Sequence, residues 1–173
     1  MFVYVCALTV AACATQSTTT SFRDQTAQIG VTSRYDHARF AGKWFVRAVV
    51  DRGSTIVQVE RRSEPVEGAS WVMFLEACPP GGGLCALIED GWQVTSGVPG
   101  AEVLRDPRGD AEWRPVVVWI DEGYRTAAVG DADGQFAWVL DRALTGGDDR
   151  IQAARQVLEF SGFDLSEMRE PQR

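Results

Sequence analysis

Histidine is scarce in this sequence, because His37 is the only one among 173 residues. A Ser-His-Asp or Cys-His catalytic arrangement would have to use this residue, and no Gly-x-Ser-x-Gly motif accompanies it. A zinc site would likewise have a single imidazole available. We therefore interpret His37 as a surface residue in the turn before the first strand. We expect no catalytic residue, no metal site and no enzymatic activity.

Positive charge is also in short supply. The chain has 17 Lys and Arg against 24 Asp and Glu, which gives a formal net charge of −7. Nucleic-acid grooves need clustered Lys and Arg, so we expect no nucleic-acid partner. Gly81-Gly82-Gly83 lacks the following Lys of a phosphate loop. Asp131-Ala132-Asp133-Gly134 has Arg142 where a calcium loop needs its Glu. No cofactor is therefore expected.

An apolar run long enough to span a bilayer is missing from the N-terminal segment. Residues 1–12 are nearly all apolar or small. A membrane-spanning helix needs ~20 such residues, so the segment predicts a signal peptide instead. Val10-Ala11-Ala12-Cys13 is similar to a bacterial lipobox, which predicts cleavage before Cys13 and lipidation of its thiol. No Lys or Arg precedes Cys13, and an ordinary signal peptide with an incidental cysteine is the alternative. Residues 13–32 are predicted to be the lipidated N-terminus and a flexible tether, because the tract 14–21 is polar and small.

Short apolar stretches with alternating polarity dominate the rest of the sequence. Turn residues separate them, a pattern that favours antiparallel β-structure. Eight such strands suit a closed barrel that can hold one small ligand. We therefore predict an all-β fold, an eight-stranded antiparallel up-and-down barrel, in a single domain over residues 33–173. The predicted strands are 43–51, 55–62, 70–78, 85–94, 101–106, 113–121, 124–130 and 135–142.

The C-terminal part of the chain has helical spacing instead. Asp149 and Gln152 have the spacing of a capping box, and Gly162 is placed as a helix C-cap. One C-terminal amphipathic helix is therefore predicted between these signals. Its apolar face would consist of Ile151, Ala154, Val157 and Leu158.

Three motifs follow one another along the predicted barrel. They are Gly42-Lys43-Trp44, then Trp119-Ile120-Asp121-Glu122-Gly123-Tyr124-Arg125, then Trp138-Val139-Leu140-Asp141-Arg142. In this order they resemble the signature segments of lipocalins, above all those of the bacterial outer-membrane lipoproteins. The resemblance implies a cup-shaped barrel with the helix on its outer wall, and a structural floor of Gly42, Trp44 and Arg142. It also implies a lipid-anchored protein of the bacterial outer membrane that faces the periplasm. A soluble periplasmic or secreted protein is the alternative.

Two cysteines flank the Pro- and Gly-rich loop between the third and fourth predicted strands. A secretory context favours disulfides, and the intervening glycines can bring two Cα atoms to the ~5.5 Å that a bridge requires. We therefore predict a disulfide between Cys78 and Cys85.

Large apolar side chains of the strands are the candidates for the ligand-binding wall. Alternation places Trp44, Val46, Ala48 and Val50 on one face, but it does not fix the inward face of the other strands. The candidate ligand-binding residues are Trp71, Met73, Phe74, Trp92, Trp119, Phe136 and Trp138. The mouth is expected opposite the floor, at the loops Asp51–Ser54, Pro79–Leu84, Pro107–Asp110 and Asp131–Gly134.

The resemblance implies binding, storage or transport of a small hydrophobic ligand, of the fatty acid or lysophospholipid class. Burial in an apolar cavity would supply the binding free energy. Two alternatives stay open: a lipocalin-fold enzyme that acts on a lipid-like substrate, and an envelope structural lipoprotein with a filled barrel. The sequence predicts no oligomeric state.

Overall fold

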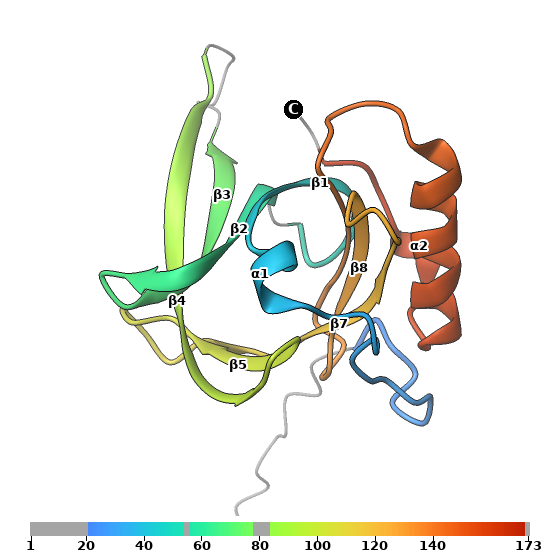
Figure 1. Cartoon of the computed structure of the whole chain (residues 1–173), viewed down its shortest axis with the longest axis horizontal. Coiled ribbons are helices and arrows are strands. Elements are labelled where there is room, and N and C mark those ends of the chain that lie inside the picture. Colours follow the sequence, from blue (N-terminus) through green and yellow to red (C-terminus); the bar gives the residue numbers. More distant parts are fainter. Residues whose placement is uncertain (1–20, 54–55, 78–83, 172–173) are drawn as a thin grey trace, which may run out of the picture.

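The protein folds as a β-barrel with one long helix against its outer wall (Figure 1). The computed structural model describes residues 21–53, 56–77 and 84–171. In these ranges the helical elements are α1 (His37–Phe40), α2 (Asp148–Phe160) and the 3₁₀ helix η1 (Leu165–Glu167). The strands are β1 (Gly42–Val50), β2 (Ile56–Val66), β3 (Ala69–Ala77), β4 (Ala86–Val98), β5 (Ala101–Arg105), β6 (Glu112–Trp113), β7 (Pro115–Ile120), β8 (Thr126–Asp131) and β9 (Ala137–Asp141).

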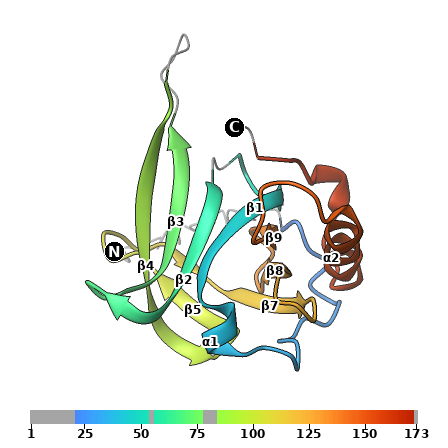
Figure 2. The same ribbon diagram turned by 45° about the horizontal axis from the view of Figure 1, so that its top comes forward.

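The strands pair antiparallel with their neighbours in sequence, and the pairing of β9 with β1 closes the ring. β6 and β7 both pair with β5 in one register, Leu104 with Trp113 and Ala101 with Val116, so together they form one side of the barrel. The predicted fold, a closed eight-stranded antiparallel barrel with one C-terminal helix, is confirmed. β3 and β4 extend beyond the other strands as a long hairpin (Figure 2).

Tight turns set the up-and-down order of the strands. The β2–β3 turn is a two-residue hairpin, because Val66 pairs with Ala69 across it. Its two central residues, Glu67 and Gly68, have φ values of 52° and 81°. Positive φ at both positions is the requirement of a type I′ turn, whose twist matches that of the flanking strands.

A β-bulge in β1 changes which side chains face the barrel interior. The register shifts between Val46 and Ala48, and a bulge inserts one extra residue into one strand. Trp44, Val46 and Val49 therefore point inward, whereas Ala48 faces outward with Val50. The prediction that Ala48 and Val50 share the face of Trp44 was wrong, because strict alternation does not continue through a bulge.

A second core lies between the barrel wall and α2. The wall contributes small side chains, including Ala48, Ala128 and Ala137, which allow α2 to approach closely. Ala154 and Leu158 of α2 are fully buried there, and Ile151 packs beside them. The predicted apolar helix face is therefore the one that contacts the barrel.

The ends of α2 match the sequence prediction only at the C-terminus. Its N-cap is Gly147 and makes no side-chain capping bond. Asp149, predicted as the cap, lies inside the first turn. Its negative charge there interacts favourably with the positive end of the helix dipole. Gly162 has φ of 92°, and the amides of Gly162 and Phe163 donate to the carbonyls of Glu159 and Leu158 at 2.9 and 3.1 Å. This pattern is a Schellman C-cap.

Residues 21–32 lie against the barrel and α2. The amide of Phe22 donates to the carbonyl of Gly134 at 2.8 Å, and that of Thr32 donates to the carbonyl of Val117 at 2.9 Å. The buried Arg23 donates through Nε to the carbonyl of Ser161 at 2.9 Å. These bonds order the backbone, so this part of the predicted tether is packed structure.

The predicted signal peptide, Cys13 and Cys78 lie outside the described residues, so cleavage, lipidation and the disulfide to Cys85 stay predictions. In the described part of the chain, no helix has both the length and the apolar character to cross a bilayer.

Candidate ligand-binding cavity

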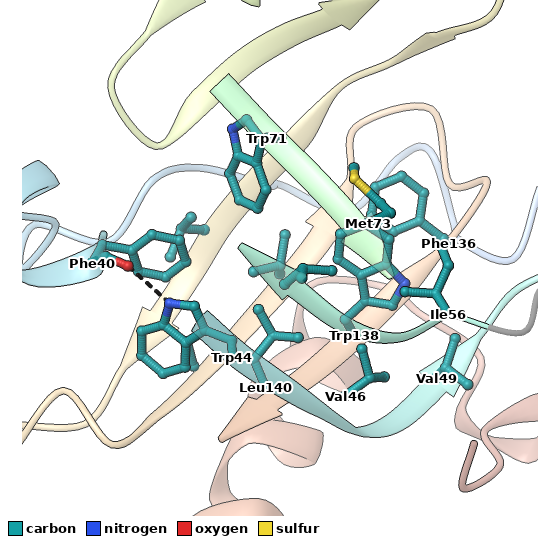
Figure 3. Close-up of a cluster of buried hydrophobic side chains, with 14 of the residues drawn as sticks. Phe40, Trp44, Val46, Val49, Ile56, Trp71, Met73, Phe136, Trp138 and Leu140 are labelled. Carbon is teal, nitrogen blue, oxygen red and sulfur yellow. Dashed lines mark hydrogen bonds between the residues drawn. The ribbon is translucent and has the colours of Figure 1, made fainter. Parts of the chain in front are cut away.

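The closed end of the barrel is built around Trp44. Its ring is fully buried, and its Nε1 donates to the carbonyl of Phe40 at 2.8 Å (Figure 3). The ring centroids of Phe40 and Trp44 lie 4.9 Å apart. Phe40 is the last residue of α1, and this short helix lies across the middle of the ring of strands (Figure 1). α1 and Trp44 together close this end.

Arg142 covers the same end of the barrel on its outer side. Its guanidinium carbon lies 3.6 Å from the Trp44 ring centroid, a cation–π geometry. It also donates to the carbonyls of Lys43 at 2.7 Å and Ala41 at 2.9 Å. Burial lowers the pKa of Arg142 to about 10, so the side chain stays charged at neutral pH. Gly42 has φ of 94°, and a Cβ there would lie 3.4 Å from Arg142 Nη1. The three predicted floor residues are thus in one cluster.

A buried ion pair fills the interior next to this floor. Arg61 donates to Glu102 from Nε at 3.1 Å and from Nη2 at 2.7 Å, and each side chain is only 7% exposed. Trp71 Nε1 donates to the same carboxylate at 2.6 Å. Burial, followed by the charge of Glu102, raises the pKa of the neighbouring Tyr35 to about 12. This half of the barrel is occupied by protein side chains.

The opposite half contains a cavity of about 370 Å³. Its polar rim comes from the β1–β2 connection, at the other end of β1 from Gly42. The lining residues are Asp51, Arg52, Gly53, Ile56, Trp113, Gln135, Phe136 and Trp138. The mouth therefore lies at Asp51–Gly53, within the first of the four loops predicted for it.

Stacked aromatic rings form one wall of the cavity. Phe136 and Trp138 stack with centroids 4.1 Å apart, and Trp92 and Trp113 stack at 4.3 Å. Trp113 and Phe136 join the two stacks at 5.0 Å. The rings come from β4, β6, β9 and the residue before β9, so the wall joins strands that are far apart in sequence. Such a surface offers burial and shape to an apolar guest and few polar contacts.

Five of the seven candidate ligand-binding residues face the interior, namely Trp71, Met73, Trp92, Phe136 and Trp138. Only Phe136 and Trp138 line the cavity directly. Trp92 lies behind Trp113, and Trp71 is hydrogen-bonded to Glu102 at the closed half.

Phe74 and Trp119 do not face the interior, and their assignment to the cavity was wrong. Phe74 follows the inward-facing Met73, so it points to the opposite face of β3, where its ring centroid lies 5.7 Å from Lys43 Nζ. Trp119 packs with Val118 beside the α2 core. A register shift between Val117 and Trp119 reverses the alternation there.

Sequence reasoning missed Trp113, Arg61 and Glu102. Trp113 pairs with Leu104, and both side chains face the interior. A correct prediction of this strand pairing would have identified Trp113 as an interior residue. Charged residues in amphipathic strands usually face water, so nothing in the pattern marked Arg61 and Glu102 as interior. The described residues contain no group of three His, Cys, Asp or Glu side chains placed to hold a metal ion.

No family model and no curated protein sequence matches this chain. Solved structures do match it. Lobster apocrustacyanin A1 superimposes with a TM-score of 0.55 at 12% identity, over 77% of each chain. Apocrustacyanins C2 and C1 both superimpose with a TM-score of 0.57 at 12% identity, over 80% of this chain and 79% of theirs. At this identity the likeness shows the fold alone, and the chain therefore has a lipocalin-like barrel with one C-terminal helix.

Proposed function

We propose that the protein binds a small hydrophobic molecule in the cavity between the β1–β2 connection and the aromatic wall. The observation that carries this proposal is the cavity itself, which has a volume of about 370 Å³ and is lined by Trp113, Phe136 and Trp138. The similar structures are described as apoproteins, a term for proteins without the group that they bind.

The size of the cavity favours a single-chain guest. Ligand pockets commonly measure ~300–1,000 Å³, so 370 Å³ lies at the low end. A fatty acid or lysophospholipid has one acyl chain, and each buried CH₂ contributes about 0.8 kcal/mol. Burial of ~14 such groups gives ~11 kcal/mol, and association costs at least ~4 kcal/mol. At most ~7 kcal/mol remains, and this limit corresponds to micromolar affinity.

The chemistry of the lining supports binding rather than catalysis. Its titratable side chains are Asp51 and Arg52, both at the rim. Asp51 accepts hydrogen bonds from the Gly53 amide and from Arg169. The aromatic wall offers no nucleophile or general base to a bound molecule.

The proposed setting is the bacterial outer membrane, with anchoring through a lipidated Cys13. It rests on Val10-Ala11-Ala12-Cys13 and on the resemblance to outer-membrane lipoprotein lipocalins. Several acyl chains anchor a protein stably, whereas one does so only marginally. Cys13→Ser in a host with lipoprotein processing should move the protein to the soluble periplasmic fraction, and unchanged membrane fractionation would contradict the anchor.

Native mass spectrometry of the purified full chain, followed by solvent extraction of the bound material, tests the binding proposal. We expect an adduct whose mass matches one single-chain lipid. Ile56→Phe should reduce the adduct by filling the cavity, whereas Val57→Phe should not, because Val57 lines a hollow with Phe45 and Leu144 outside the cavity. An adduct equally abundant in both variants would place the lipid elsewhere on the protein.

A further inference from the structure

Trp138 carries a buried hydrogen-bond donor beside the cavity. Its side chain is fully buried, and among the described residues no acceptor lies within hydrogen-bond distance of its Nε1. The other buried indoles do have acceptors: Trp44 donates to Phe40, Trp71 to Glu102 and Trp92 to Asp90. Trp138 therefore differs from the other tryptophans of the core.

This nitrogen lies in the wall of the cavity, where neighbouring side chains cover it. Trp138 and Ile56 both line the cavity, and Figure 3 draws the indole nitrogen on the side of the ring toward Ile56. One face of the ring is covered by Phe136, stacked at 4.1 Å. An N–H donates in the plane of its ring, so an acceptor that reaches this nitrogen approaches beside Ile56, after the side chains that cover the nitrogen move.

We propose that Trp138 Nε1 donates a hydrogen bond to a neutral oxygen of the bound molecule, such as the carbonyl of a ketone or an ester. This inference rests on the proposed binding function and specifies the chemistry of the ligand. A buried N–H without an acceptor loses its hydration and gains nothing in return. A ligand that supplies an acceptor at this point removes that penalty, whereas a hydrocarbon of the same shape does not.

The acceptor is neutral because the inner wall offers no counter-charge. The lining residues around Trp138 are apolar or uncharged, and Asp51 and Arg52 lie at the rim. Arg61, the buried cation nearer the floor, is already hydrogen-bonded to Glu102 and to the carbonyl of Ser70. A carboxylate buried against one indole N–H would remain largely unpaired, which is costly. An ionised headgroup therefore stays at the mouth, and a neutral oxygen occupies the inner site.

Two probes of equal chain length test this inference: a long-chain methyl ketone and the corresponding alkane. Trp138→Phe keeps an aromatic ring but removes the N–H. We expect the variant to bind the ketone about fivefold or more weakly than the wild type, the scale of one neutral hydrogen bond. The loss of ring surface should weaken alkane binding too, but by less, so the ratio of ketone affinity to alkane affinity should fall in the variant. Trp113→Phe is the matched control, since it also trims a cavity indole and should affect both probes alike.

The outcomes separate this inference from the binding proposal. Equal losses for ketone and alkane in Trp138→Phe would overturn the hydrogen bond and leave the cavity function intact. Failure of the wild type to bind either probe would overturn the binding proposal itself. A second measurement does not depend on the variant being folded. In ¹⁵N-tryptophan NMR spectra of the wild type, the Trp138 indole proton should shift downfield with the ketone and not with the alkane. The same shift with both probes would contradict the inference.

Discussion

The closed end of the barrel should behave as one energetic unit made of Trp44 and Arg142. Trp44→Ala removes a fully buried indole, and such a truncation costs about 3–5 kcal/mol of unfolding free energy. Arg142→Met removes charge-assisted bonds to the carbonyls of Arg39, Phe40, Ala41 and Lys43, which should cost about 2–3 kcal/mol. Because the guanidinium lies 3.6 Å from the ring centroid, the double variant should be ~1–2 kcal/mol more stable than additivity predicts.

Urea denaturation of the four proteins in this double-mutant cycle measures the coupling. Arg47→Met with Trp44→Ala is the control cycle, because Arg47 bonds instead to the carbonyls of Ala143 and Gly146. Its two losses should add within ~0.5 kcal/mol. Additive losses in the Arg142 cycle as well would refute the contact and the role of Arg142 in closing the barrel.

Three further predictions follow from the buried polar groups and the cysteines. Tyr35→Phe should leave unfolding free energy at neutral pH unchanged or higher, since the buried hydroxyl has no hydrogen-bond partner in the described part of the chain. The pKa of Tyr35 is raised from 10.0 to about 12, so the unfolded chain releases its proton first and wild-type stability should fall from pH 10 to pH 12. Denaturation across this window should show a smaller fall in Tyr35→Phe, and identical slopes would contradict the shift. Glu102→Gln should cost about 3–5 kcal/mol because it leaves the Arg61 charge unpaired, and Arg61→Met in the same background should recover part of that loss; calorimetry showing no recovery would exclude the coupling. Thiol alkylation without reduction should label neither Cys78 nor Cys85, and labelling of both would refute the disulfide.

The overall fold could be predicted from the sequence because its signals are local. Alternation and turn residues marked the strands, and the spacing of Ile151, Ala154 and Leu158 marked the helix face that packs on the barrel. The contact between Trp44 and Arg142 was predicted from the resemblance of two separated motifs to lipocalin segments, not from a local pattern.

The inward faces were harder to predict because they depend on bulges. The shifts after Val46 and Val117 each add a residue that reverses the alternation, and no residue type in either strand signals them. Trp119 was a candidate because it is a large aromatic residue of a strand, and the shift before it turns its side chain outward. The pairing of Arg61 with Glu102 joins residues 41 positions apart, and only the closed barrel brings them together.

The chain-length dependence of ligand affinity tests the central claim most directly. Saturated single-chain lipids of increasing length are titrated into the delipidated protein, and tryptophan emission is followed because Trp113 and Trp138 line the cavity. Each added CH₂ should strengthen binding by up to about 0.8 kcal/mol until the cavity is full, with micromolar affinity reached before the plateau. Ile56→Phe should reach the plateau at a shorter chain, and Val57→Phe should follow the wild type. Millimolar affinity at every length, with the same response in both variants, would contradict a ligand-binding cavity.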